Sequence, residues 1–423
     1  FIRHDGAWAL GLIGDPRGLP ALRAVASDKA TPEKYVAIAK EFIRTIESKS
    51  QPTTAPKTDA GPRAVAEKQA ATEQRSSESP TKKWEASLGG PIHGAAIIDG
   101  GRVYASSGSG ELICLDLKDG TRLWSYRTGD GSQPESKDQM RATPTVTPEL
   151  IFVGDRAGSL HCVHRADGTP KWRFSTEDEV HGAAVVAGEQ VLFGSYDGGV
   201  YSVNIKDGTL AWKFATGSHV HAALRVVDDE VLVAGCDGQL RVLQLKDGMQ
   251  KRSFGLGSYL TTTPAIVGDM AYVANFGGEL FAVNWKTGEQ AWKHSAGTDP
   301  ILSSPLVTER FVVFGCHDKK VRALDRLTGK TVWQVATQDR VVASPVLSGS
   351  QVLIGGHDGR LYALELATGA VAWKVSLGDA VSAAAAVHDD LIVIGSESDS
   401  GKLAAFEAPM NASGKLEERT EAK

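Results

Sequence analysis

The stretch GGHDGRLYALELATGAVAW at residues 355–373 returns throughout the chain in altered form. It reads GSYDGGVYSVNIKDGTLAW at 194–212 and ANFGGELFAVNWKTGEQAW at 274–292. Each copy alternates apolar and polar residues, is rich in β-branched and aromatic residues, and places glycines between the apolar runs. That pattern is typical of short strands joined by tight turns. The sequence therefore predicts a repeated unit made of β-strands.

Tryptophans mark the period of this repeat. From Trp84 to Trp373 they recur about every 40 residues, and a doubled step is explained by Arg252, which stands where a tryptophan is due. From Gly120 on, a tight Asp-Gly or Thr-Gly turn precedes each mark by four residues. Four short strands in a unit of this length, repeated radially, are typical of a β-propeller blade.

The segments that open the units give the number of blades. They are rich in small residues, which suits innermost strands that converge on an axis, and they read IHGAA, MRATPTV, VHGAAVV, VHAALRV, LTTTPAIV, ILSSPLV, VVASPVL and VSAAAAV. The last unit has three strands and lacks the fourth, whereas TKKWEASLG at 81–89 reads as an additional strand ahead of the first unit. The sequence therefore predicts a mainly β fold, an eight-bladed β-propeller closed by an N-terminal strand that joins the C-terminal blade.

The residues before the repeats differ in character. Residues 1–48 read as helices, with Asp15 as an N-cap and Pro16 at a first helical position. Residues 49–80 are rich in Pro, Ser, Thr, Ala, Gln and charge, which is typical of a flexible linker. The predicted divisions are a helical segment at 1–48, a linker at 49–80, the propeller at 81–408 and a disordered tail at 409–423. Because the chain begins with Phe1 inside a helical pattern, we expect its N-terminus and any signal peptide to be missing.

Two motifs resemble known families. The unit G-S-x-D-G-x-L-Y-A-L-x-x-x-T-G-x-x-x-W, nearly complete at 355–373, resembles the PQQ-type propeller repeat, and the resemblance covers residues 82 to about 408. That family includes quinone-dependent alcohol dehydrogenases and the non-catalytic BamB lipoprotein of outer-membrane assembly. AWALGLIGDPRGLPAL at 7–22 resembles HEAT-like repeats of the phycobilisome-lyase type, with a stray helical hairpin as the alternative. The resemblance implies either an enzyme or a scaffold, since fold does not fix function.

Composition excludes some classes of function. The 423 residues are 42% hydrophobic and 23% charged, which is ordinary for a soluble globular protein. The net charge of -5 gives no electrostatic reason to expect a nucleic-acid partner, and no apolar run is long enough for a membrane span. The cysteines are too widely spaced for a zinc site or a disulfide framework, so we expect small buried thiols. They are Cys114, Cys162, Cys236 and Cys316.

One repeat position carries candidate ligand-binding residues. In successive units it holds His93, Arg141, His181, His221, Thr261, Leu302, Val342 and Ser382. The residue before each is apolar, so alternation places this position on the opposite side of the inner strand. Three histidines and an arginine would then face one mouth of the central channel, where they could bind an anion, a carboxylate-bearing peptide or, through the imidazoles, a transition metal. The alternative is that they pair with blade backbone or ordered water.

Other residues carry weaker signals. His317 and His357 stand in equivalent turns between second and third strands, and we interpret them as surface residues. His161 and His164 flank Cys162, but one strand alone cannot complete a metal site. The polar insertion TGDGSQPESKDQMR at 128–141 interrupts the period and is a candidate for partner contact, with an idle surface loop equally open.

No catalytic constellation stands out from the repeat. By the resemblance, quinone-dependent dehydrogenases of this fold hold PQQ under a disulfide of adjacent cysteines, above a tryptophan and beside Ca²⁺, and this chain has no adjacent cysteines. The sequence therefore predicts a non-catalytic protein-binding or assembly scaffold without cofactor or metal. The resemblance implies a location in the cell envelope, in the periplasm or outside the cell as a secreted protein. The alternative is a quinone-dependent oxidoreductase or a small-ligand sensor that uses the channel mouth.

Overall fold

The computed structural model describes residues 79–128 and 140–409, with six single helical residues nearer the N-terminus: Arg23, Ala26, Ser27, Lys40, Ile43 and Arg44. The chain divides into two compact units, residues 1–73 and 74–423. Almost all of the predicted helical segment, linker and tail lies outside the described residues, so those boundaries stay predictions. Within the described part, no helix is both long and apolar enough to cross a membrane.

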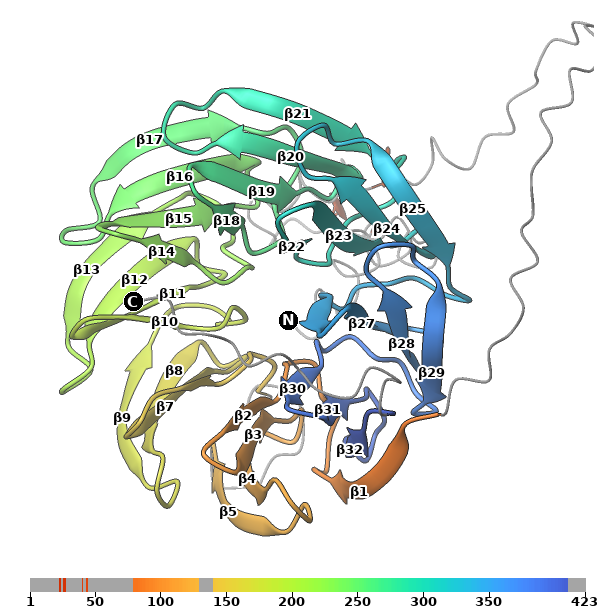
Figure 1. Ribbon diagram of the computed structural model, residues 1–423. Coiled ribbons are helices and arrows are strands. Elements are labelled where there is room, and N and C mark those ends of the chain that lie inside the picture. The colour runs from red at the N-terminus through yellow and green to blue at the C-terminus, as the bar shows by residue number, and fades with distance from the viewer. Residues whose placement is uncertain are drawn as a thin grey trace, which may run out of the picture. The chain divides into compact units, whose positions relative to one another are not determined.

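The second unit is an eight-bladed propeller, as predicted. Eight four-stranded antiparallel sheets are arranged around one axis (Figure 1). We letter the strands of a blade A to D from the axis outward, because A strands of neighbouring blades contact one another. The turns between B and C strands therefore lie on one face of the propeller, the first face, and the A–B and C–D turns lie on the second face.

The first four blades have these strands. Blade 1 holds β2 (Ile97–Asp99), β3 (Arg102–Ser106), β4 (Glu111–Asp116) and β5 (Arg122–Arg127). Blade 2 holds β6 (Thr145–Val146), β7 (Leu150–Gly154), β8 (Ser159–His164) and β9 (Pro170–Ser175). Blade 3 holds β10 (Val185–Ala187), β11 (Gln190–Gly194), β12 (Gly199–Asn204) and β13 (Leu210–Ala215). Blade 4 holds β14 (Arg225–Val227), β15 (Glu230–Ala234), β16 (Gln239–Gln244) and β17 (Gln250–Gly255).

The other four blades follow the same order until the last. Blade 5 holds β18 (Ala265–Val267), β19 (Met270–Ala274), β20 (Glu279–Asn284) and β21 (Gln290–Ser295). Blade 6 holds β22 (Leu306–Val307), β23 (Phe311–Cys316), β24 (Lys320–Asp325) and β25 (Thr331–Ala336). Blade 7 holds β26 (Val346–Ser348), β27 (Gln351–Gly356), β28 (Arg360–Glu365) and β29 (Val371–Ser376). Blade 8 holds β30 (Ala386–His388), β31 (Leu391–Gly395), β32 (Lys402–Glu407) and β1 (Thr81–Ser87).

The ring is closed by its first strand, as predicted. β1 pairs antiparallel with β32, from Thr81 opposite Glu407 to Ser87 opposite Lys402 (Figure 1). Lys83 of β1 also forms a 3.0 Å ion pair with Glu407. This pairing completes the blade that the C-terminal repeat leaves with three strands, so no open end of the array remains.

The innermost strands are shorter than the sequence predicts. The segment IHGAA at 92–96 precedes β2, and the other A strands likewise begin several residues after the opening of their units. Hydroxyl side chains bond to the backbone of the neighbouring blade there. For example, Thr143 Oγ1 accepts from the backbone N–H of Ala95 at 3.0 Å, and Ser344 Oγ accepts from that of Ser304 at 3.0 Å. Crowding at the axis thus selects small residues but leaves too little room for long A strands.

Most seams between blades are held by a tryptophan and a glycine. At five of the eight seams the indole Nε1 of the D-strand tryptophan donates to a backbone carbonyl in the C–D turn of the next blade, at 2.8 to 2.9 Å. The donors are Trp84, Trp172, Trp212, Trp292 and Trp333. The glycine three residues after that carbonyl packs on the indole face. We call this pair of contacts the latch.

The seam between blades 4 and 5 shows why Arg252 is tolerated. Trp285, from the C–D turn of blade 5, is buried in the same core cluster as the neighbouring strands of blade 4. The guanidinium of Arg252 lies 5.9 Å from the Trp285 ring centroid, and Gly288 packs on Phe254 in place of an indole. The missing aromatic ring is therefore supplied from the opposite side of the seam.

The latch predicts unequal costs for two glycines of one blade. Gly208 has φ 74° and a Cβ there would lie 2.7 Å from the Trp172 ring, whereas Gly188 has φ 58° and open space around it. Both Gly→Ala changes force a left-handed residue, at about 1–2 kcal/mol. Gly208→Ala should lose about 1–3 kcal/mol more, because it also overpacks the seam. Urea unfolding measures both, and equal losses would contradict the latch.

Candidate functional site

The eight predicted axial positions share one environment. Each is half-buried, and the apolar residue before each is fully buried, as the alternation requires. Two of these side chains bond to the B–C turn of the preceding blade: Tyr196 bonds to His221 and His357 bonds to Ser382, each pair 25 residues apart. The closing step of the ring obeys the same rule, because Glu397 of blade 8 bonds to His93 of blade 1. The axial site therefore contains residues of the B–C turns beside the predicted positions.

Glu397 organises the first part of the site. Its Oε1 lies 3.2 Å from His93 Nδ1 and also accepts from the Ser382 hydroxyl. Ser382 Oγ lies 2.9 Å from His357 Nε2. Burial raises the pKa of Glu397, but the bonds from His93 and Ser382 outweigh it and lower that pKa to about 2.

Glu179 organises the second part. It stands between Arg156, whose Nη2 is 3.0 Å away, and His181, whose Nε2 contacts the other carboxylate oxygen. Burial again raises the pKa, and the bonds from His181 and Arg156 bring it down to about 2. Both carboxylates at the axis are therefore charged at neutral pH.

Arg141 interacts electrostatically with both of these carboxylates. Desolvation by burial lowers its pKa, and its electrostatic neighbours are Arg156, Glu179, Glu397 and Tyr196, which come from blades 2, 3 and 8. A guanidinium keeps its charge under any such shift. The four predicted residues are thus brought together, but around the carboxylates of Glu179 and Glu397, which the repeat pattern does not indicate.

Aromatic rings continue the site into blades 3 and 4. Tyr196 is sandwiched between His181, at 4.6 Å and 14°, and His219, at 4.8 Å and 5°. Its hydroxyl bonds to His221 Nδ1. Burial lowers the pKa of His221 to about 4, with His181 and His219 adding to the effect, so its imidazole is neutral at neutral pH.

The interpretation of His317 and His357 as surface residues is wrong. Both stand in B–C turns as expected, but they are half-buried at the axis on the first face. Burial lowers the pKa of His317 to about 4 and also lowers that of His357, with Arg340 contributing to both. Six of the 11 histidines therefore gather at this end of the axis: His93, His181, His219, His221, His317 and His357.

Other residues singled out in the sequence have structural roles. His161 is buried, with Nε2 at 2.7 Å from Asp155 and Nδ1 at 2.9 Å from the Tyr126 hydroxyl. All four cysteines are free thiols whose pKa is raised to between about 11 and about 12, mainly by burial, and Cys236 is half-buried where the other three are buried. Residues 129–139 of the insertion lie outside the described residues.

The axial residues do not form a metal site or a nucleophile. Among the described residues, no group of three or more His, Cys, Asp or Glu side chains is placed to hold a metal ion. Ser382 has a histidine neighbour, but its single proton goes to Glu397, so His357 Nε2 acts as the donor to Ser382 Oγ and cannot serve as its base. The arrangement is a network of paired charges at a solvent-accessible rim.

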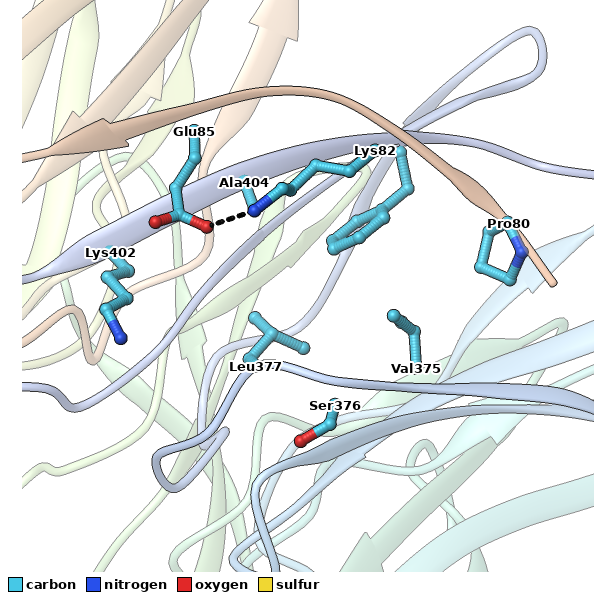
Figure 2. Close-up of a pocket in the computed structure, with 9 residues that line it drawn as sticks. Pro80, Lys82, Glu85, Val375, Ser376, Leu377, Lys402 and Ala404 are labelled. Carbon is cyan, nitrogen blue, oxygen red and sulfur yellow. Dashed lines mark hydrogen bonds and ion pairs between the residues drawn. The ribbon is translucent and has the colours of Figure 1, made fainter.

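A groove lies at the seam that β1 closes. It has a volume of about 240 Å³, and Figure 2 shows the ion pair of Lys82 with Glu85 on β1 facing Val375 and Leu377 across it. Trp373, the latch tryptophan of this seam, has no partner for Nε1 in the described residues, and the D strand of the neighbouring blade is β1. The groove is a consequence of how the ring closes.

The fold and the axial network define a β-propeller protein of the PQQ-like repeat class. The chain belongs to the family described as outer membrane protein assembly factor BamB, because that family's model matches residues 64–145, 132–258 and 251–408. A PBS lyase HEAT-like repeat model matches residues 2–28, a small part of the chain.

Individual relatives cover different shares of the chain. Outer membrane protein assembly factor BamB of Xanthomonas campestris is 34% identical over 90 residues, 21% of this chain and 22% of that protein. The chain thus matches about a fifth of that relative's length. BamB from Moraxella catarrhalis has a similar fold, with TM-score 0.67, 19% identity, and coverage of 78% of this chain and 98% of that one. Quinohemoprotein alcohol dehydrogenase from Comamonas testosteroni gives TM-score 0.68, 13% identity, and coverage of 82% and 79%.

The residues present do not fit the quinone arrangement that the resemblance implies. Cys114, Cys162, Cys236 and Cys316 lie in four different blades, so no adjacent pair exists. The repeat tryptophans lie at the outer seams, and the axis holds histidines, arginines and carboxylates. The likeness to the dehydrogenase therefore rests on fold alone.

Proposed function

We propose that this chain is a non-catalytic scaffold that binds protein partners in the bacterial cell envelope, in the periplasm or in secreted form. Membership of the BamB family is the observation that carries the proposal. The described axial residues support it, because Glu179 and Glu397 bond to neighbouring Arg, His and Ser side chains and do not activate a nucleophile.

We propose the axial network on the first face as a contact site for the partner. His93, Arg141, His181 and His221 present cationic or neutral donors beside two fixed carboxylates, which suits a partner segment of mixed charge. A network held by its own bonds changes little on binding, so less entropy is lost when the partner docks.

Site-specific photo-crosslinking in cells tests this contact. A crosslinker at Glu177 or Asp299, both exposed on the first face, should trap an envelope protein. The same group at Lys206 or Lys246, exposed in C–D turns of the second face, should not. The first-face adduct should weaken in the double variant His181→Ala, His221→Ala. Adducts of equal strength from both faces would contradict the proposed site.

The oxidoreductase alternative is tested separately. We expect the protein incubated with PQQ and Ca²⁺ to show no dye-linked alcohol oxidation and to retain no quinone absorbance after gel filtration. Retained stoichiometric quinone or turnover would overturn the scaffold proposal. The variants His93→Ala and Ser382→Ala then decide whether any retained quinone sits at the axis.

A further inference from the structure

A second cleft opens on the opposite face of the propeller, between blades 1 and 2. Its volume is about 560 Å³, which is within the range of small-molecule sites. The A–B turns of both blades and the C–D turn of blade 2 line it, and its charged or titratable side chains are Arg102, Glu149, His164 and Arg165.

The seam beneath this cleft is unlike the five latched seams. Trp124 is the latch tryptophan here, and Gly168 packs on its ring as usual, but its buried Nε1 has no partner in the described residues. The expected acceptor is the carbonyl of Arg165, which instead receives Arg102 Nη1 at 3.4 Å. Blade 6 shows that an arginine in the C–D turn is not the cause, because the carbonyl of Arg326 keeps its bond from Trp292. At this seam Arg102, and not Trp124, donates to the carbonyl of the C–D turn.

The repeat itself serves as a comparison set for two residues of the cleft. Arg102 opens its B strand, and the equivalent residues are Leu150, Gln190, Glu230, Met270, Phe311, Gln351 and Leu391. His164 ends its C strand, and the equivalents are Asp116, Asn204, Gln244, Asn284, Asp325, Glu365 and Glu407. At both positions the seven other blades carry no basic residue. A blade of this repeat therefore forms without a basic residue at either position, and Arg102 and His164 line the same cleft.

The donors of this cleft are only partly used. Arg165 is held by the Tyr104 hydroxyl at 2.8 Å, by the Thr147 carbonyl at 3.3 Å and by Asp99. Arg102 uses Nη1 on two carbonyls, whereas its Nε and Nη2, and both ring nitrogens of His164, have no hydrogen-bond partner in the described part of the chain. Glu149 adds an exposed carboxylate to the same cleft.

We propose that this cleft binds a small hydroxycarboxylate, with its carboxylate on Arg102 and His164 and its hydroxyl donating to Glu149. A guanidinium with a free edge favours a carboxylate, through charge-assisted hydrogen bonds. Glu149 disfavours a ligand that is anionic throughout and favours one that also carries a donor. The proposal is independent of the scaffold role and of the axial site.

Tartrate and succinate form a matched pair of probes, because both are four-carbon dicarboxylates and tartrate alone has hydroxyls. Titration calorimetry of the full chain at low ionic strength should show saturable binding of tartrate to a single site, and weaker binding of succinate. Arg102→Gln and His164→Asn should each weaken tartrate binding by about tenfold or more. Both substitutions install residues that the repeat already carries at equivalent positions, so the fold should tolerate them.

Two further variants complete the test. Glu149→Ala should abolish the preference for tartrate over succinate, and Arg326→Leu, which removes an arginine from the equivalent C–D turn of blade 6, should change nothing. The absence of saturable tartrate binding to the unaltered chain would overturn the proposal. So would an unchanged affinity in Arg102→Gln, or an equal loss in Arg326→Leu. The same acid group could also stand at the end of a polymer. A glycoside or peptide that carries this group, titrated in place of tartrate, distinguishes a polymer end from a free small acid.

Discussion

Trp84→Ala should lower the free energy of unfolding by about 3–5 kcal/mol, the range for removing a large buried aromatic ring. Trp84 is 7% exposed and packs in one cluster with residues of blades 1 and 8. Its Nε1 donates to the Leu117 carbonyl at 2.8 Å, so the substitution removes both the latch and the main apolar contact of the closing strand. Urea unfolding followed by tryptophan fluorescence and circular dichroism measures the loss.

Leu123→Ala is the matched control for this change. Leu123 also lies in a D strand, but its side chain is 46% exposed and the truncation leaves little cavity. We expect a loss within about 0.5 kcal/mol, as for most surface substitutions. A loss in Trp84→Ala no larger than that would show that the first strand does not carry the closure.

Acidification should destabilise the propeller through its axis. His221 and His317 have a folded-state pKa of about 4, below the 6.5 of an exposed imidazole, so between these values the unfolded chain binds protons that the fold does not. The free energy of unfolding therefore falls as pH drops from 6.5 to about 4, by about 3 kcal/mol for His221 alone. Glu179 and Glu397, with pKa lowered from 4.5 to about 2, extend the decline, because their stabilisation is present above pH 4.5 and is lost as pH falls through 2.

Substitution separates this effect from general acid unfolding. His221→Gln keeps an oxygen for the Tyr196 hydroxyl and removes the titration, so its unfolding free energy should depend less on pH between 6.5 and 4. His388→Gln is the control, since that side chain is 53% exposed on β30. Parallel pH profiles for the unaltered chain and His221→Gln would show that the axial imidazole is not the source.

The fold was predictable because its constraints lie close together in the sequence. The tight turn at Gly208 requires a positive φ, and a Cβ at this residue would clash with the Trp172 ring. Both requirements favour glycine at this position of the repeat. Closure by TKKWEASLG was predictable for a related reason, since a missing strand at one end matched a surplus strand at the other. The A strands were placed too early, because small residues mark the crowded axis rather than the strand itself.

The site was less predictable because its contacts cross between blades. Position in the repeat identified His93 and His181, but their carboxylate partners stand at two other repeat positions. His93 and Glu397 are 304 residues apart, and they meet only when the ring closes. Glu179 lies two residues before His181, in a loop with other acidic residues, so the sequence does not distinguish it from its neighbours. The rule that an axial residue can lie beside the preceding blade's B–C turn would have found Glu397, but not Glu179, which stands in the segment that leads into β10.

The pairing of β1 with β32 also affects how the chain matures. β1 is synthesised before the other strands of the propeller and β32 after them, so the two strands cannot pair until β32 has been made. The blades between them therefore assemble while the edges of both strands lack a partner. A nascent chain halted before residue 402 would therefore expose strand edges that can pair with neighbouring molecules.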